Sequence, residues 1–149
     1  MYIEDYTLLT NDRLQVIKKF ANECKDLEGE FIEMGVYRGG AALAIAKSSN
    51  RMIHLFDSFK GLPKPSDIDK HREGQFNENR LNVEKVLMLF KVKYEIHEGF
   101  IPDTFKDCNI DKVAFAHVDL DLYEGTKSAI EFLKPRMVKG GIIIFDAIS

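Results

Sequence analysis

The stretch from residue 30 to residue 57 constrains the fold more than any other part of the chain. An apolar run that includes Phe31 and Ile32 is followed by the glycine turn Gly35–Gly40 and the small-residue segment 41–46. A second apolar run, 52–56, ends at Asp57. A strand, a glycine turn, a helix, a strand and a carboxylate form the usual device for holding an adenosine. The glycines let backbone approach the ligand, and the acid accepts hydrogen bonds from ribose hydroxyls.

The rest of the chain continues the alternation of helix and strand. Periodic apolar residues predict helices over 11–27, 79–90 and 121–134. A further helix is expected to begin at Gly39–Gly40 and to end at about residue 47. Short apolar runs predict strands over 30–34, 52–56, 93–97, 113–118 and 142–145. Asp121 and Glu124 form a capping-box pattern before the last helix, and Gly140–Gly141 form a turn into the last strand. Such alternation predicts an α/β fold with one parallel sheet and right-handed crossovers.

The composition excludes several classes of protein. With 149 residues, 45% hydrophobic and 30% charged, the chain suits one globular domain, 1–149. A net charge of -3 and a pI near 5.8 argue against a nucleic-acid partner. The longest aliphatic run, Ile142–Phe145, is far too short to cross a membrane. Cys24 and Cys108 stand alone and the first residues form no signal peptide, which together predict a cytoplasmic protein.

Acidic residues gather where the predicted strands end. Asp57, Asp119 and Asp146 each follow a strand, and Glu33 lies in the closing turn of another. The carboxyl ends of parallel strands meet at one edge of a sheet, where ligands bind. A single such acid is usually solvated or caps the next helix, but four at one edge repel one another unless something positive compensates them. A sulfonium, an amine or a divalent cation would each do so.

The glycine turn itself narrows the choice of cofactor. A dinucleotide fingerprint is GxGxxG, whereas here three residues separate Gly35 from Gly39 and the middle one is the bulky Tyr37. The phosphate-binding pattern GxxxxGK[ST] is absent from the sequence, which disfavours ATP hydrolysis. An acid two residues before the first glycine suits a ligand with an amine and no phosphate. S-adenosylmethionine is such a ligand.

Four segments together resemble a known family. They are Glu-Met-Gly-Val-Tyr-Arg-Gly-Gly-Ala (33–41), His-Leu-Phe-Asp-Ser-Phe-Lys-Gly-Leu-Pro (54–63), His-Val-Asp-Leu-Asp-Leu-Tyr-Glu-Gly-Thr (117–126) and Gly-Gly-Ile-Ile-Ile-Phe-Asp (140–146). In order and spacing they are similar to the macrocin O-methyltransferase (TylF/MycF/NovP-like) family over nearly the whole chain. The resemblance implies a Rossmann-like class I methyltransferase fold, with strand order 3-2-1-4-5 and a closing 6/7 hairpin. Its members use S-adenosylmethionine, and usually Mg²⁺, to methylate a hydroxyl that is often on a sugar.

The resemblance also assigns roles to individual residues. Those expected around the methionine part of the cofactor are Glu33, Gly35, Tyr37 and Gly39, and those around the ribose are Asp57, Ser58 and Gly61. Gly99 is expected on the adenine side, and Thr7 matches a threonine that lies near the cofactor in relatives. Asp119 and Asp146 match Mg²⁺ ligands. The expected acceptor is a carbohydrate-like small molecule, and Asp119 is also expected to take the proton from its hydroxyl.

Two departures from the family pattern bear on activity. Relatives carry a second acid after the fifth strand where this chain has Ala147. The sequence ends at Ser149, before the family's last two strands, so the 6/7 hairpin is expected to be missing. We therefore expect an exposed edge at Ile142–Phe145, open to pairing with another copy, in a protein that is truncated or a fragment. The rival interpretations are a cofactor-binding remnant without activity and, more weakly, a module that binds NAD or a nucleotide sugar.

Three histidines lie in or beside the predicted strands. His54 and His97 have apolar neighbours, and their sequence context favours a structural role. His117 directly precedes the acidic end of the fourth strand, where a role as base is open but less favoured than a structural one.

Overall fold

The computed structural model describes residues 3–60 and 80–146, which form one five-stranded parallel sheet in the order β3-β2-β1-β4-β5. The helices and strands are η1 (Ile3–Tyr6), α1 (Asn11–Glu23), β1 (Glu30–Met34), α2 (Gly40–Ser49), β2 (Ile53–Asp57), α3 (Arg80–Leu89), β3 (Tyr94–Glu98), η2 (Asp103–Asp107), β4 (Val113–Val118), α4 (Tyr123–Leu133), η3 (Lys134–Arg136) and β5 (Met137–Phe145). The predicted α/β class and strand order 3-2-1-4-5 are confirmed.

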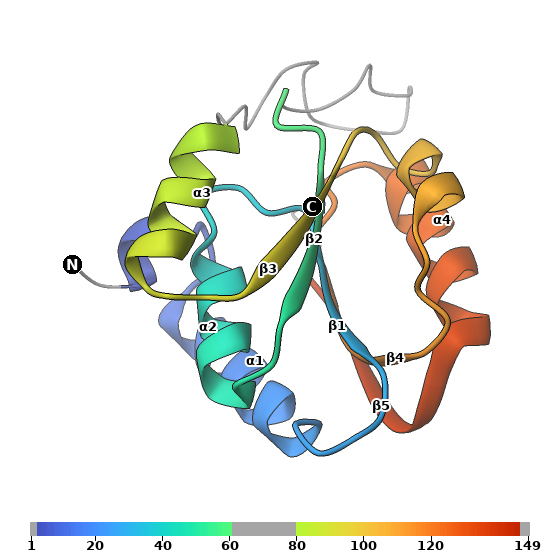
Figure 1. Ribbon diagram of the computed structural model, residues 1–149, viewed down its shortest axis with the longest axis horizontal. Helices are drawn as coiled ribbons and strands as arrows, with labels where there is room; N and C mark the ends of the chain where they lie inside the picture. Colours follow the sequence, from blue (N-terminus) through green and yellow to red (C-terminus); the bar gives the residue numbers. More distant parts are fainter. Residues whose placement is uncertain (1–2, 61–79, 147–149) are drawn as a thin grey trace.

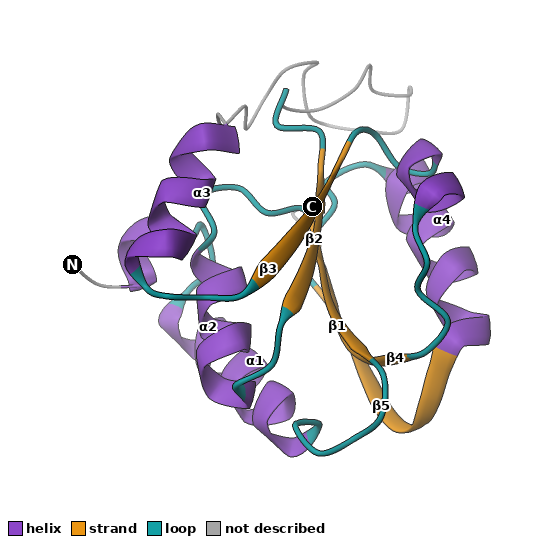
Figure 2. Ribbon diagram, viewed as in Figure 1, coloured by secondary structure: helices purple, strands orange, loops and turns teal. Residues whose placement is uncertain are grey.

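Helices cover both faces of the sheet. Figure 1 shows α1, α2 and α3 on one side and α4 on the other, and Figure 2 shows the strands between these layers. Side chains alternate between the faces along each strand, so Phe31 and Phe115 face α1–α3 while Ile32 and Phe56 face α4. Each face of the sheet packs its own apolar core. Among the described residues, no helix is both long enough and apolar enough to span a bilayer.

Helix α1 is shorter than predicted. It ends at Glu23, whereas the apolar pattern extended it to residue 27. The Cys24 N–H still bonds back to Phe20, but the following residues form turns in which the Leu27 N–H donates to the Cys24 carbonyl. These turns lead into Gly29, whose φ of +124° lets the chain reverse into β1.

The predicted capping box of α4 is wrong. Leu122, and not Asp121, occupies the N-cap position, and no side chain caps this helix. Leu122 is buried in an extended conformation, and its carbonyl accepts the first helical hydrogen bond from the Thr126 N–H. Burial of this apolar side chain therefore decides where α4 begins, against the preference of aspartate for the N-cap.

Strand β5 begins five residues before its predicted start. Gly140 and Gly141 lie inside the strand and do not form a turn that precedes it. Gly140 has φ +86°, and the pairing with β4 shifts there, because Val113 pairs with Met137 while Phe115 pairs with Ile142. The two glycines thus form a β-bulge. Strand β5 is the last strand of the described sheet, as expected for an edge.

Gly35 has the closest contact of the described glycines, and we predict that Gly35→Ala destabilises the fold. Its φ is +87°, and an added Cβ would lie 2.2 Å from the Asp119 carbonyl oxygen. The free energy of unfolding should fall by roughly 2–6 kcal/mol, because left-handed strain and overpacking each cost roughly 1–3 kcal/mol. Urea unfolding measures the change. The matched variant is Gly125→Ala, inside α4. The added Cβ would lie 3.6 Å from its nearest neighbour, Leu120 Cδ1, so the free energy of unfolding should stay the same or rise. Equal stability of the two variants would contradict the packing described.

Candidate functional site

Backbone hydrogen bonds hold the ends of the strands together at the carboxyl edge. The Gly35 N–H donates to the Phe56 carbonyl at 2.9 Å, and the Asp119 N–H donates to Met34 at 2.8 Å. Farther along the edge, the Asp146 N–H donates to Val118 at 2.9 Å. These bonds tie the residues that directly follow β1, β4 and β5 to the neighbouring strands, and so fix them at the carboxyl edge. The predicted gathering of strand-end acids at one edge is confirmed.

Asp57 shapes the glycine turn. One of its oxygens, Oδ2, accepts the Val36 N–H at 2.7 Å, and Oδ1 accepts the Phe59 N–H at 2.9 Å. Next to Val36, Tyr37 adopts φ +51°, a left-handed conformation that costs energy for a bulky residue. Each carboxylate oxygen can accept a second hydrogen bond, so Asp57 keeps capacity for ribose hydroxyls while it holds the turn.

The segment around Thr7 lies against the start of α2. A Cβ placed on Gly40 would lie 2.6 Å from the Tyr6 carbonyl oxygen and 2.8 Å from Thr7 Cβ. Gly39, with φ +95°, is the N-cap of α2, and the Thr7 hydroxyl accepts the Leu9 N–H at 3.0 Å. Thr7 is far from the glycine turn in sequence, yet the structure brings the two together.

The other predicted cofactor positions follow β2 and β3. The Gly99 N–H donates to the Asp57 carbonyl at 2.9 Å, which joins the two strand ends. Ser58 is buried, and its hydroxyl accepts the Lys60 N–H at 3.1 Å. Gly61 and Ala147 lie outside the described residues. Of the expected site residues that the structure describes, all lie on segments at or beside the carboxyl edge.

A chain of four charged side chains crosses the edge from β1 to α1. His117, fully buried in β4, places Nδ1 2.6 Å from Glu33 Oε2 and Nε2 2.6 Å from Asp146 Oδ2. Arg13 of α1 donates from Nε to the other oxygen of Asp146 at 2.8 Å. Both ring nitrogens of His117 thus face carboxylate oxygens, an arrangement that an imidazolium with two N–H donors satisfies.

The electrostatics agree with a positively charged His117. Burial alone would lower its pKa, but the charge of Glu33 and the hydrogen bonds to Asp146 and Glu33 raise the pKa of His117 to about 10. Burial also acts to raise the pKa of Asp146, and hydrogen bonds from His117 and Arg13 lower it below its usual value. For the fully buried Glu33, burial outweighs the attraction of His117 and raises the pKa. His117 therefore acts as the internal cation of the site.

Asp119 differs from the other acids at this edge. Its Oδ1 is buried and has no hydrogen-bond partner among the described residues. Burial raises the pKa of Asp119 to about 7. The charge of His117 acts to lower this pKa, and that of Glu33 acts to raise it further. A carboxyl group with this pKa changes its charge near neutral pH and can accept a proton from a neighbouring group.

The two expected metal ligands are not equivalent. Asp119 offers an oxygen without a partner in the described structure, which suits a cation or a proton donor. Asp146 has both oxygens engaged, one by Arg13 and one by His117. A divalent cation would have to displace these positive groups, so the described residues fit Mg²⁺ through Asp119 alone.

Sequence reasoning missed part of this network. Arg13 carried no signal beyond its place on the amphipathic helix α1, and its partner Asp146 lies 133 positions away in the chain. His117 stood next to the acids in sequence, but its two carboxylate partners come from β1 and from the end of β5. Only the strand order brings them together.

The comparisons with known proteins agree with the fold. Residues 3–149 match the family model described as macrocin-O-methyltransferase (TylF). The chain is 32% identical over 138 residues (79% of this chain, 52% of the relative) to the 8-demethyl-8-(2,3-dimethoxy-alpha-L-rhamnosyl)-tetracenomycin-C 4'-O-methyltransferase of Streptomyces olivaceus. It is 27% identical over 162 residues (95% of this chain, 62% of the relative) to the demethyldecarbamoylnovobiocin O-methyltransferase of Streptomyces niveus.

Solved structures show the same architecture. The O-methyltransferase NovP superposes with a TM-score of 0.83 at 24% identity, over 95% of this chain and 66% of that one. A calicheamicin methyltransferase superposes with a TM-score of 0.77 at 26% identity, over 91% of this chain and 63% of that one. The chain therefore spans about half to two thirds of the length of these relatives.

We predict that the His117 ring stays doubly protonated well above neutral pH. Since folding raises its pKa from 6.5 to about 10, its contribution to stability is complete below about pH 6.5 and is lost as the pH rises through about 10. Ring ¹⁵N chemical shifts, measured by NMR from pH 6 to 9, should remain those of an imidazolium. A midpoint near 6.5, the value of an unperturbed histidine, would contradict the bridged arrangement.

Proposed function

The chain belongs to the macrocin O-methyltransferase (TylF) family, and on this premise we propose that it transfers a methyl group from S-adenosylmethionine to a hydroxyl of a sugar or related metabolite. Support comes from the relatives, whose names describe O-methyltransferases that act on a rhamnosyl tetracenomycin and on mycinamicin III. One observation carries the proposal: Asp119 lies beside the glycine turn, and its buried Oδ1 has no hydrogen-bond partner among the described residues.

The residues of the turn fit S-adenosylmethionine. Carboxyl groups lie on either side of Gly35, Glu33 in β1 and Asp57 at the end of β2, and the Asp119 carbonyl packs closely against the glycine. The amino group and sulfonium of the cofactor bring the positive charge that such an edge favours. Asp57 would hold the ribose, since it lies at the end of β2 and keeps free lone pairs. Gly99 and Ser58 would border the adenine and ribose.

When bound, the cofactor supplies a methyl carbon made reactive by positive sulfur. The transfer would form a bond between that carbon and the acceptor oxygen and would break the carbon–sulfur bond, with its electron pair left on sulfur. Asp119 then takes the hydroxyl proton, for which a pKa of about 7 is well matched near neutral pH. The contacts of His117 with Glu33 and Asp146 hold these three side chains in position near Asp119, and they set the charge around the Asp119 carboxyl group. Holding the two reactants in line contributes most of the rate.

Assistance by Mg²⁺ is the weaker part of the proposal. It is supported by the family pattern and by the available oxygen of Asp119. It is opposed by Asp146, whose oxygens are engaged, and by Ala147 in place of a second acid. We therefore derive no step through the ion. A non-catalytic remnant is the competing function, favoured by the same engagement of Asp146.

Further expectations concern the setting of the domain. We propose that residues 1–149 act as one cofactor-binding domain and that β5, with its exposed Phe145, pairs with a second copy. Light scattering that shows only monomers at high concentration would contradict this pairing. Cys24 and Cys108 are free thiols, which supports the proposed cytoplasmic location.

Cofactor binding should depend on Asp57. We predict that Asp57→Ala weakens the binding of S-adenosylhomocysteine by about 1–3 kcal/mol, because buried donors lose their acceptor. Calorimetry measures the Kd, and circular dichroism checks that the variant is folded. Glu98→Gln is the control, since Glu98 also ends a strand but pairs with Arg80 at the surface. Unchanged affinity in Asp57→Ala would remove Asp57 from the site, and tight binding of NAD by the wild type would favour the dinucleotide alternative.

Methyl transfer should depend on Asp119 more than binding does. In Asp119→Asn we expect S-adenosylhomocysteine affinity near that of the wild type, while turnover of mycinamicin III or a related glycoside falls roughly 10²–10⁴-fold. The wild-type rate should rise through about pH 7, as Asp119 ionises, and this rise should be absent from the variant. Asp103→Asn, at an exposed position, is the control.

The same assay separates the alternatives. Cofactor binding by the wild type without turnover of any glycoside would favour the remnant. Turnover that EDTA abolishes and Mg²⁺ restores would establish the metal requirement, whereas turnover indifferent to EDTA would exclude it.

A further inference from the structure

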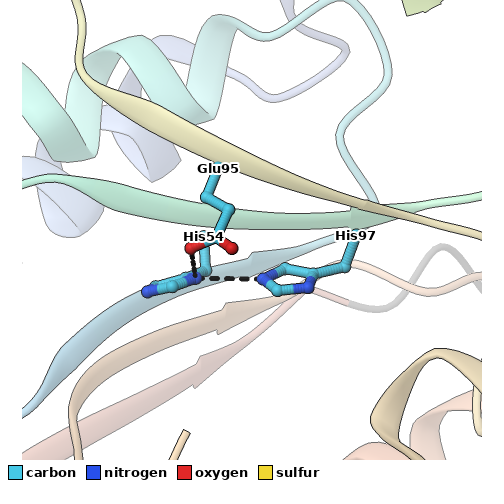
Figure 3. A group of neighbouring side chains, drawn as sticks. All are labelled: His54, Glu95 and His97. Carbon is cyan, nitrogen blue, oxygen red and sulfur yellow. Dashed lines mark hydrogen bonds and ion pairs between the residues drawn. The ribbon is translucent and has the colours of Figure 1, made fainter. Parts of the chain in front are cut away.

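A second group of ligand-type side chains lies on β2 and β3, apart from the acidic edge. His54 of β2 and both Glu95 and His97 of β3 each offer one possible ligand atom, and these atoms all lie within 4.8 Å of one another. Figure 3 shows Glu95 and His97 on the same strand, both turned toward the ring of His54. The register explains the meeting, because His54 pairs with Glu95 and Phe56 pairs with His97.

The group is separate from the proposed methyl-transfer site. His54 pairs with Ile32, which faces the α4 core, whereas Glu33 and His117 lie on alternate positions and face the α1–α3 side. The two clusters thus lie on opposite faces of the sheet. The two sites also differ in their position along β2, since His54 is the second residue of the strand and Asp57 of the proposed methyl-transfer site is its last residue.

Hydrogen bonding leaves His54 with an electron pair directed at the cluster. Its Nε2 lies 3.0 Å from Glu30 Oε2, and a carboxylate can only accept, so Nε2 carries a proton. In the neutral ring Nδ1 is then an acceptor. It lies 3.0 Å from His97 Nε2 and 3.4 Å from Glu95 Oε2. The contact between Nδ1 and the Glu95 carboxylate therefore brings two acceptors together, which requires a proton or a metal cation to make it favourable.

The surroundings resemble those of a metal-binding histidine. A histidine that binds a metal through one nitrogen usually donates its other N–H to a carboxylate, which is the relation between His54 and Glu30. Phe56 stacks on the His97 ring with centroids 4.4 Å apart, and this contact fixes the ring plane. The side chain of His54 is 7% exposed, while those of Glu95 and Glu30 are 57% and 44% exposed. The cluster is rigid on the protein side and open to water on the other.

We propose that His54, Glu95 and His97 bind a divalent transition-metal ion of the Zn²⁺ class, with Glu30 orienting His54 and water completing the coordination. Ligands at about 2.0–2.1 Å in a tetrahedral site are separated by about 3.3–3.4 Å. The two separations from His54 Nδ1 are 3.0 and 3.4 Å, and all three ligand atoms lie within 4.8 Å of one another, so a small adjustment of the exposed Glu95 would complete the geometry. Two imidazoles and one carboxylate suit Zn²⁺ and disfavour Mg²⁺ and Ca²⁺, which prefer oxygen ligands.

The ion would cross-link the edge strand β3 to β2. Strand β3 is the outermost strand on its side, and it is flanked by water at Glu95. Because metal bound to the folded chain alone stabilises that state, Zn²⁺ should raise the midpoint of thermal unfolding. The site rests on residues outside the proposed methyl-transfer machinery, so its test is independent of that function.

The test is a calorimetric titration of the metal-free chain with Zn²⁺ alone. We expect one ion per chain with a Kd below about 100 μM, and no comparable competition by excess Mg²⁺. Glu95→Gln and His97→Gln should each weaken Zn²⁺ binding at least about tenfold, and Glu30→Gln about 10–100-fold through its effect on His54. Glu95 is more than half exposed, so its variant folds even if His97→Gln does not.

Two controls locate the ion. His71→Gln removes a histidine that lies outside the described residues, and Asp119→Asn removes the available acid of the other site; both should leave the Zn²⁺ affinity unchanged. Binding weaker than about 100 μM, affinity unaffected by Glu95→Gln, or loss of binding in either control would each overturn the proposal. In the first of these cases, a proton shared by His54 and Glu95 is what joins the cluster.

Discussion

The convergence of carboxylates at one edge of the sheet is the constraint on which the rest of the site depends. Each of them must be compensated, because burial penalises an unpaired charge. The acids in question are Glu33, Asp57, Asp119 and Asp146. The N–H groups of Val36, in the glycine turn, and of Phe59, after β2, compensate Asp57, and the His117 imidazolium lies between Glu33 and Asp146. Asp119 keeps a buried oxygen without a described partner, and this is the reason for proposing it as the base.

This charge balance also joins parts of the fold that are distant in sequence. Arg13 links α1 to the end of β5 through Asp146, so the first helix helps to fix the last strand. Asp57 links the end of β2 to the turn after β1 through Val36. The interactions that arrange the site therefore also hold the sheet edge in shape. A substitution that removes one of these partners should alter neighbouring segments as well as the charge.

Local patterns predicted some elements to the residue and others poorly. Strands β1 and β4 begin and end where the sequence placed them, because their apolar runs are bounded by charged or glycine residues. The start of α4 was missed because burial of Leu122 outweighs the capping preference of Asp121, and burial is not local information. Strand β5 was predicted too short because Gly140 resembles a turn residue when its bulge opposite β4 is unknown. The acids of the site were predictable from strand ends, whereas Arg13 depended on tertiary contacts.

The replacement of the second strand-end acid by Ala147 is consistent with the network around Asp146. A pair of adjacent acids requires a cation, and a bound metal is one way to provide it. With a single acid, two cationic groups of the protein itself, Arg13 and His117, occupy both oxygens of Asp146. The positive charge beside Asp119 is then built into the fold. A carboxylate with a pKa near 7 is a stronger base than an ordinary one, so the proton removal proposed for Asp119 would not require an ion in this arrangement.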